Sequence, residues 1–267
     1  MIATGIVYGV VLVLFALIQR SLLYFPTHHR VADELRIAAR AGLEPRVDER
    51  RGVLSFLAPH PVGAEATWIV AHGNAGTALD RTYFVDLVRR APTPSDVVLV
   101  EYPGYGAREG EPDEAANVAA VVEAIDAAKA NGRPIVLLGE SLGSAVVALA
   151  AAQRRDDVSA MVLVTPLPRL ALVAAHHYPF IPTILLADRY EADAAIARFA
   201  GPVAFVVARH DEVIPAPLGL AMHAGYRGPK LLEIDDEATH NSVDYDPTLD
   251  RWRRVFDFVD DAIRSSR

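Results

Sequence analysis

The stretch between residues 134 and 152 limits what this chain can fold into more than any other part of the sequence. Residues 135–138, Ile-Val-Leu-Leu, are typical of a buried parallel strand, and the small-residue run at 144–152 predicts a closely packed helix. Gly139-Glu-Ser-Leu-Gly143 lies between them, so we expect a tight strand-to-helix turn where a Cβ at either glycine would collide with a neighbouring element. Such a turn strains Ser141 and exposes its hydroxyl beside the free N–H groups of a helix N-terminus.

The composition excludes several classes of function. The chain has 267 residues and no cysteine, which excludes disulfides and thiolate catalysis. Its net charge of −8, with no basic run, argues against a nucleic-acid partner. Nine histidines are present, but the adjacent pairs His28-His29 and His176-His177 lack the i, i+4 spacing of a metal site. We therefore expect neither a metal nor a cofactor.

Residues 2–18 carry no charged side chain and are mostly apolar. As a helix the run is about 26 Å long, slightly short of a ~30 Å hydrocarbon core, and Arg20 with residues 22–25 at the interface would close the gap. We expect residues 1–20 to be an uncleaved membrane anchor, because no basic segment precedes the run and no A-x-A site follows it. A cleaved signal peptide and a buried N-terminal helix are the alternatives. The arginines after the run, from Arg20 to Arg40, predict a catalytic domain on the cytoplasmic side.

Strands and helices alternate through the rest of the chain, after a juxtamembrane segment at 21–52 that includes a short amphipathic helix at 33–41. The expected strands are 53–57 at the sheet edge, then 67–71, 97–100, 135–138, 160–164, 203–207 and 230–234, and the expected helices are 79–90, 114–130, 144–152 and 249–263. This alternation predicts one α/β domain at 53–267 with a mostly parallel, doubly wound sheet. The pattern breaks at about 166–200, an apolar stretch with four prolines, which we interpret as a lid; an ordinary crossover with a broken helix is the alternative.

Two later loops supply the groups that a nucleophilic serine needs. Asp211 follows the strand at 203–207 and His240 follows the last strand, so both should lie at the carboxyl edge of the sheet, close to Ser141. A histidine can take the serine proton, and a carboxylate can fix the tautomer of that histidine. The alternatives are His210 as the base and Glu212, Asp235 or Asp236 as the acid.

The chain resembles the α/β-hydrolases in five segments and in the order Ser141, Asp211, His240. The matching segments are His72-Gly-Asn-Ala-Gly76, Tyr102-Pro-Gly-Tyr-Gly106, Gly139-Glu-Ser-Leu-Gly143, Asp211-Glu-Val-Ile-Pro215 and His240-Asn241. The chain is most similar to the membrane-anchored bud-emergence-protein-like branch, which is related to monoacylglycerol lipases and depalmitoylases. Its hydrophobic N-terminus and the lid sequence Tyr178-Pro-Phe-Ile-Pro182 match that branch as well.

The resemblance implies an α/β-hydrolase fold with a short lid, and a serine hydrolase that cleaves carboxylic esters of lipids or acylated molecules through an acyl-serine intermediate. Ser141 would be the nucleophile, His240 the base and Asp211 the acid. The backbone N–H groups of Asn74 and Leu142 would form the oxyanion hole. Alternative functions are a thioesterase, a peptidase or an acyltransferase on the same scaffold, and a non-catalytic membrane-anchored binding protein.

Overall fold

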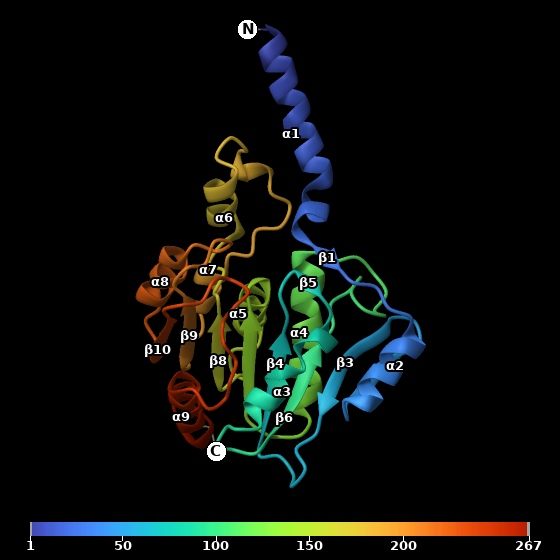
Figure 1. Ribbon diagram of the computed structural model, residues 1–267, viewed down its shortest axis with the longest axis vertical. Coiled ribbons are helices and arrows are strands. Elements are labelled where there is room, and N and C mark those ends of the chain that lie inside the picture. Colours follow the sequence, from blue (N-terminus) through green and yellow to red (C-terminus); the bar gives the residue numbers. More distant parts are fainter. Residues whose placement is uncertain (1, 266–267) are drawn as a thin grey trace.

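A central sheet organises the computed structural model, which describes residues 2–265 (Figure 1). Its strands are β2 (Glu44–Asp48), β3 (Gly52–Ala58), β4 (Ala66–Ala71), β6 (Ser95–Val100), β7 (Ile135–Glu140), β8 (Ala160–Val164), β9 (Val203–Ala208) and β10 (Lys230–Asp235). They lie in the order β10-β9-β8-β7-β4-β6-β3-β2, and all neighbours are parallel except at the β6–β3–β2 end, where the pairing is antiparallel. The predicted mostly parallel, doubly wound sheet is confirmed.

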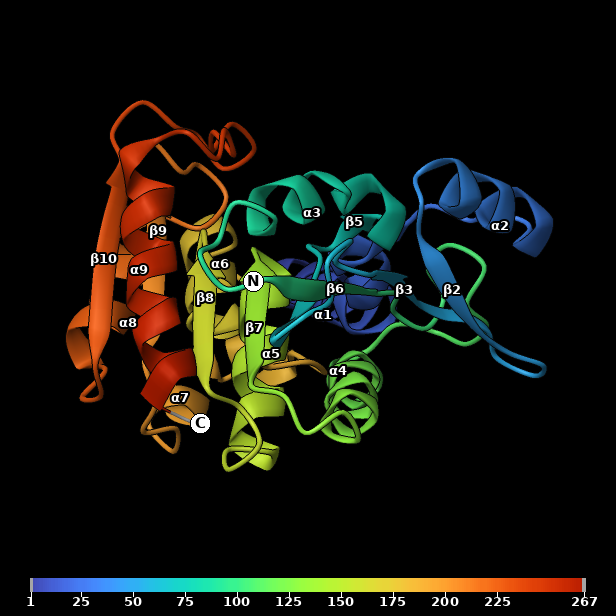
Figure 2. The same cartoon turned by 90° about the horizontal axis from the view of Figure 1, so that it is seen from below.

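Helices cover both faces of this sheet (Figure 2). One face is covered by α4 (Glu114–Lys129), α5 (Leu142–Gln153), α7 (Ala192–Ile196) and α8 (Ala216–Gly225), and the other by α2 (Val31–Arg40), α3 (Tyr83–Val88) and α9 (Asp250–Ser265). Successive strand residues point to opposite layers, as Trp68 and Ile69 of β4 do. Because both faces are covered, the central strands are apolar throughout rather than alternating.

The N-terminal helix α1 (Ile2–Leu23) projects away from the sheet (Figure 1). Its segment Thr4–Leu23 is long and apolar enough to cross a membrane, and none of the most apolar part is buried in the protein. The alternative of a buried N-terminal helix is therefore wrong. A short parallel pair, β1 (Phe25–Pro26) with β5 (Ala75–Gly76), joins the end of α1 to the loop that follows β4.

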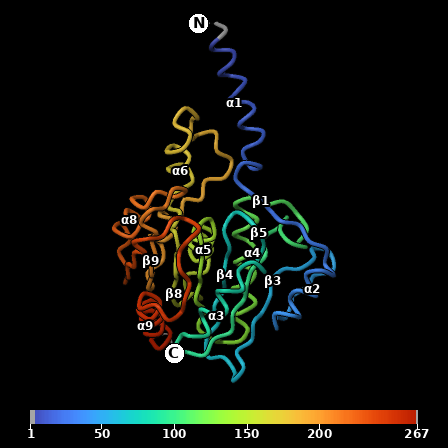
Figure 3. Tube along the Cα trace, in the orientation of Figure 1, coloured from blue at the N-terminus to red at the C-terminus, as the bar shows by residue number. Residues whose placement is uncertain are grey.

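The segment between β8 and β9 divides into two parts. Helix α7 packs on α5 and buries Ala192, Ala195 and Ile196, so it belongs to the helical layer. Helix α6 (Leu170–His177) buries no residue and, with the short helix η2 (Thr183–Leu185), projects from the carboxyl edge of the sheet beside α1 (Figures 1 and 3). The projecting part, residues 170–187, is shorter than the stretch expected from the prolines.

The prediction missed α8, and two of the expected elements differ in the structure. β3, expected at the sheet edge, is covered by β2, whose proline and charged residues suit a short edge strand. The helix expected at 79–90 is interrupted, because the short helix η1 (Ala78–Arg81) ends before α3 begins at Tyr83. Asp80 Oδ2 accepts hydrogen bonds from the backbone N–H and the hydroxyl of Thr77, at 2.8 and 3.1 Å, which holds this first turn as a separate unit.

Candidate active site

The turn at 139–143 forms between the end of β7 and the start of α5. Ser141 has φ 55° and ψ −122°, a conformation that a non-glycine residue rarely adopts. Both glycines are needed, because a Cβ on Gly139 would lie 2.3 Å from the carbonyl oxygen of Gly143, and a Cβ on Gly143 would lie 2.2 Å from that of Ala71. The N–H of Ser141 donates to the carbonyl of Val164 at 2.9 Å, so the neighbouring strand β8 holds the strained residue in place.

The structure brings Ser141, His240 and Asp211 together from the ends of three strands. The Oγ of Ser141 lies 2.8 Å from Nε2 of His240, and Nδ1 of His240 lies 2.8 Å from Oδ2 of Asp211. The other carboxylate oxygen of Asp211, Oδ1, accepts the N–H groups of Val213 and Ile214 at 2.9 and 2.7 Å. With Nδ1–H donating to the carboxylate, Nε2 is left to accept the serine proton.

The alternative acids and the alternative base make other contacts than those of the cluster around Ser141. Glu212 Oε2 accepts the backbone N–H of His240 at 3.3 Å, which leaves the imidazole ring to Asp211. Asp235 lies in β10 and pairs with Arg251, and Asp236 pairs with Arg209. His210 is exposed to solvent.

The loop after β4 lies against the serine and is held by the end of α1. A Cβ on Gly73 would come 3.5 Å from the Cβ of Ser141. The carbonyl of Asn74 accepts the N–H of Phe25 at 2.8 Å and the hydroxyl of Tyr105 at 2.7 Å. The side-chain amide of Asn74 donates to the carbonyl of Leu23 at 2.7 Å. The position of this loop therefore depends on the segment that leaves α1.

The two N–H groups predicted to bind an oxyanion flank the same serine. Leu142 is the first residue of α5, so its N–H has no acceptor in the helix ladder and lies at the positive end of the helix dipole. Asn74 follows Gly73 in the loop that touches Ser141. The two predicted donors therefore come from two different elements that both adjoin Ser141.

A buried carboxylate that the sequence analysis missed supports this loop. Glu101, directly after β6, is fully buried and accepts the N–H of Ala78 at 3.0 Å. Nε2 of His72 lies 3.1 Å from Glu101 Oε1, while Nδ1 of His72 lies 2.8 Å from the carbonyl of Gly73. Both ring nitrogens face oxygen atoms, so the imidazole is fixed between the Glu101 carboxylate and the backbone of the loop. An acidic residue placed directly after an apolar strand was the available signal.

Glu34 of α2 is the second buried carboxyl group of this region. A Cβ on Gly106 would lie 2.1 Å from Glu34 Oε1 and 2.6 Å from Glu101 Oε2, so both carboxyl groups meet at this glycine. Burial, and then the negative charge of Glu101, raises the pKa of Glu34 to about 7. Nδ1 of His29 lies 3.4 Å from the same carboxyl group.

Glu140, the residue before the serine, is held by three donors. The hydroxyl groups of Tyr245 and Tyr83 donate to Glu140 Oε1 at 2.7 and 3.1 Å, and Nε of Arg81 donates to Oε2 at 2.8 Å. Burial and the charge of Glu140 raise the pKa of both tyrosines above their usual range. The arginine comes from η1, and the network fixes the strand side of the elbow.

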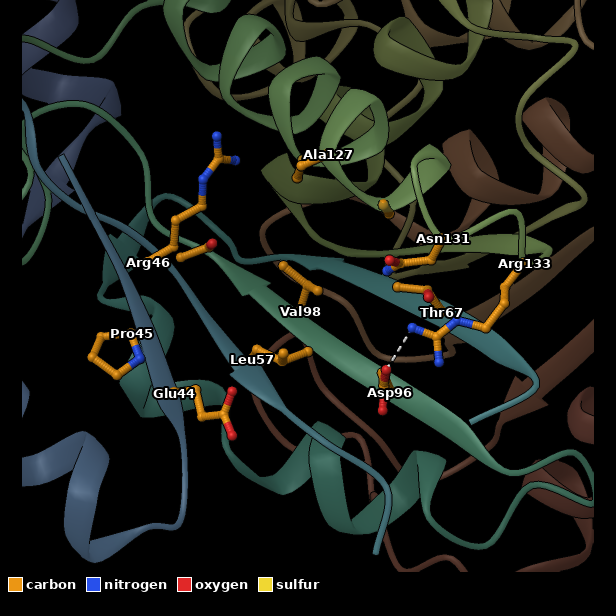
Figure 4. Close-up of a pocket in the computed structure, with 13 residues that line it drawn as sticks. Glu44, Pro45, Arg46, Leu57, Thr67, Asp96, Val98, Ala127, Asn131 and Arg133 are labelled. Carbon is orange, nitrogen blue, oxygen red and sulfur yellow. Dashed lines mark ion pairs between the residues drawn. The ribbon is translucent and has the colours of Figure 1, made fainter. Parts of the chain in front are cut away.

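A hollow of about 300 Å³ lies at the amino edge of the sheet, away from the carboxyl edge that carries Ser141 (Figure 4). Thr67 and Asp96, near the amino ends of β4 and β6, line it together with Arg133, whose guanidinium is 2.8 Å from the Asp96 carboxylate. Ser141, His240 and Asp211 are not among the residues that line it, so this hollow is not part of the candidate active site. Among residues 2–265, no group of three or more histidine and acidic side chains is arranged to hold a metal ion.

The fold is that of a class of hydrolases. The chain belongs to the α/β-hydrolase family, whose model matches residues 68–259. It is 32% identical over 250 residues to the uncharacterized protein Rv2307c of Mycobacterium tuberculosis, covering 90% of this chain and 85% of that protein.

Solved structures with the same fold include a lipase and an esterase, Pf2001 of Pyrococcus furiosus, which matches with a TM-score of 0.64 at 14% identity, covering 85% of this chain and 95% of Pf2001. Est1E from Butyrivibrio proteoclasticus, solved with ferulic acid bound, matches with a TM-score of 0.65 at 18% identity, covering 82% of this chain and 98% of Est1E. The monoacylglycerol lipase of Paleococcus ferrophilus matches with a TM-score of 0.57 at 17% identity, covering 78% of this chain and 98% of the lipase. At these identities the likeness shows the fold.

Proposed function

We propose that this α/β-hydrolase is a serine esterase that cleaves carboxylic esters through an acyl-serine intermediate. The observation that carries the proposal is the pair of 2.8 Å contacts that links Ser141 to His240 and His240 to Asp211. The esterase and lipase among the structural neighbours support the same reaction class. Membership of the bud-emergence-protein-like branch stays a prediction.

The proposed reaction uses each group for one task. The Oγ of Ser141 attacks the ester carbonyl while Nε2 of His240 takes its proton, and the Asp211 carboxylate balances the imidazolium that forms. The N–H groups of Asn74 and Leu142 stabilise the oxyanion, and losing one such donor typically costs ~10²–10³ in rate. His240 then protonates the leaving alcohol, and a water activated by the same histidine releases the acid.

The N-terminal helix favours a membrane-anchored form over a cleaved signal peptide. Nε of Arg20 donates to Asp188 Oδ2 at 3.1 Å, and the amide of Asn74 donates to the carbonyl of Leu23. Residues discarded with a signal peptide would have no reason to bond with the domain, so we propose that α1 stays attached as an anchor. The arginines from Arg20 to Arg40 favour a catalytic domain on the cytoplasmic side.

An anchored enzyme with an apolar lid fits a lipid or acylated ester as substrate. Thioester and amide cleavage, and transfer of the acyl group to an acceptor other than water, use the same groups and stay alternatives. A non-catalytic binding protein is the alternative from another class, and it requires no reactive serine.

Labelling by a fluorophosphonate separates these functions. The full-length protein in detergent should react with the probe and hydrolyse p-nitrophenyl esters, and Ser141→Ala should lose both properties while keeping its circular dichroism spectrum. Ser265→Ala, at the exposed end of α9, is the control and should keep both. Labelling that persists in Ser141→Ala would remove this serine as the nucleophile.

A further inference from the structure

Two long stretches of this chain have no Asp, Glu, Lys or Arg, and the structure places them side by side. One is residues 2–19, most of α1, and the other is residues 170–187, which include α6 and η2 and which we call the lid tip. Figure 1 shows both projecting in the same direction, beyond the helices that cover the sheet. We propose that the lid tip inserts into the same membrane leaflet as the adjoining part of α1. This inference rests on the proposed role of α1 as an anchor.

Both uncharged stretches end at the same ion pair. Arg20 is the first charged residue after the stretch in α1, and Asp188 is the first after the lid tip. The guanidinium of Arg20 donates to both carboxylate oxygens of Asp188, at 3.1 and 3.2 Å, and lies 3.6 Å from Asp113. Charged side chains thus begin at one level for both segments, as expected at the boundary between hydrocarbon and headgroups.

The lid tip leaves large apolar side chains uncovered. Phe180 is 81% exposed, Ile184 is 77% exposed and Tyr178 is 58% exposed. α6 buries none of its residues. Apolar side chains this exposed are unfavourable in water and favourable in lipid, so a surface of this kind beside a candidate membrane span marks a membrane contact.

Polar side chains of α1 satisfy backbone groups of the lid tip. The hydroxyl of Tyr8 donates to the carbonyl of Phe180 at 2.8 Å. The amide of Gln19 donates to the carbonyl of Leu185 at 3.1 Å, and its oxygen accepts the N–H of Ala187 at 2.7 Å. Irregular backbone is tolerated at membrane depth only where the protein itself supplies such partners. These contacts therefore make the lid tip and α1 one inserted unit.

The depth of the lid tip can be worked out from its contacts with α1. The rise between Tyr8 and Gln19 is about 16 Å at ~1.5 Å per residue, roughly half of a ~30 Å hydrocarbon core. Atoms that are hydrogen-bonded to these two side chains share their depth to within one side-chain length. If α1 spans a bilayer, the lid tip lies inside the leaflet that faces the catalytic domain.

Insertion of the lid tip narrows the substrate class. Nε2–H of His177, the last residue of α6, donates to the carbonyl of Val213 at 2.8 Å, in the loop that carries Asp211. The lid tip therefore connects the bilayer with the side of the candidate active site that carries Asp211. An ester dissolved in the bilayer through its acyl chain can reach Ser141 along this unit without crossing water, whereas a water-soluble ester gains nothing from it.

The test reads the depth of one residue in the full-length protein reconstituted in phosphatidylcholine vesicles. Phe180→Trp is compared with Val62→Trp, whose native side chain is 82% exposed in the β3–β4 loop at the amino edge of the sheet. The native Trp68 and Trp252 are buried and give the same background in both variants. Lipids with brominated acyl chains should quench the introduced indole of Phe180→Trp strongly. That of Val62→Trp should be quenched only by aqueous acrylamide.

The outcomes separate this inference from the proposals on which it rests. Extraction of the wild-type chain from the vesicles by alkaline carbonate overturns the anchor, and the insertion of the lid tip with it. Resistance to carbonate, combined with an indole at position 180 that bromine does not quench, overturns the insertion alone. Resistance to carbonate, combined with bromine quenching of the indole at position 180 but not of the indole at position 62, supports the insertion of the lid tip. Fluorophosphonate labelling of the same vesicles shows independently whether Ser141 is reactive.

Discussion

Replacing Asp211 by asparagine should remove most of the activity, because the structure decides which way the new amide faces. Oδ1 of Asp211 accepts two backbone N–H groups, from Val213 and Ile214, at 2.9 and 2.7 Å. The asparagine has to keep its oxygen at that position, which turns its NH2 group toward Nδ1 of His240. That ring nitrogen must then accept a hydrogen bond, so the ring proton moves to Nε2, the atom that has to receive the proton of Ser141.

The expected loss comes from this misplaced proton. In the serine–histidine–aspartate template the corresponding substitution lowers kcat by about 10⁴. This equals roughly 5.5 kcal/mol of barrier, at ~1.36 kcal/mol for each factor of ten. The free energy of unfolding should change much less, because the side chain keeps its shape and its two N–H partners.

Glu212→Gln is the matched control for this substitution. Glu212 accepts the backbone N–H of His240, at 3.3 Å, and an amide oxygen can do the same. We expect its kcat for a p-nitrophenyl ester, measured on the full-length protein in detergent, to stay close to that of the wild type. Near-normal turnover by Asp211→Asn, or a severe loss in Glu212→Gln, would refute the assignment of the acid.

Two further substitutions test the elbow and the buried carboxyl pair. Gly143→Ala should lower both activity and stability, because the new Cβ would lie 2.2 Å from the carbonyl oxygen of Ala71 and overpacking of this kind costs about 1–3 kcal/mol. Gly225→Ala, with open space around it, should change neither in the same urea denaturation and esterase assays. The free energy of unfolding should also fall as the pH rises from about 4.5 to about 7, because the folded chain retains a proton on Glu34 that the unfolded chain releases. Glu34→Gln should flatten this fall in denaturation series at different pH, and an equal fall in the variant would contradict the role given to Glu34 beside Glu101.

The sequence predicted the parts of the molecule that short patterns determine. The strands and the elbow around Ser141 depend on apolar runs and on glycines where a Cβ has no room, and both signals lie within a few residues of the feature. Helix 79–90 was predicted unbroken because the periodicity of its apolar residues continues across the break at Thr82. β2 was missed because a charged edge strand with a proline carries no apolar pattern.

The contacts that the sequence did not predict join residues far apart in the chain. Tyr24 was expected at the lipid interface, but it is buried, and its hydroxyl lies 3.1 Å from Asp188 and 2.9 Å from the hydroxyl of Tyr190. The contacts of Glu140 were not predicted, because its donors come from α3, η1 and the segment before α9. No local pattern encodes such pairs, since they depend on how the layers assemble.

The junction between α1 and the domain determines at which residue a shortened, water-soluble version of this protein should begin. A chain that begins after Tyr24 would leave the Asp188 carboxylate, whose side chain is 5% exposed, without the guanidinium of Arg20. It would also leave the Asn74 amide without the carbonyl of Leu23. A buried carboxylate that loses a charged partner costs about 1–3 kcal/mol, and the half-buried Asn74 amide lies in the loop that touches the serine. A soluble protein that begins just before Arg20 should therefore keep the activity of the full-length chain. One that begins a few residues later should show a lower activity.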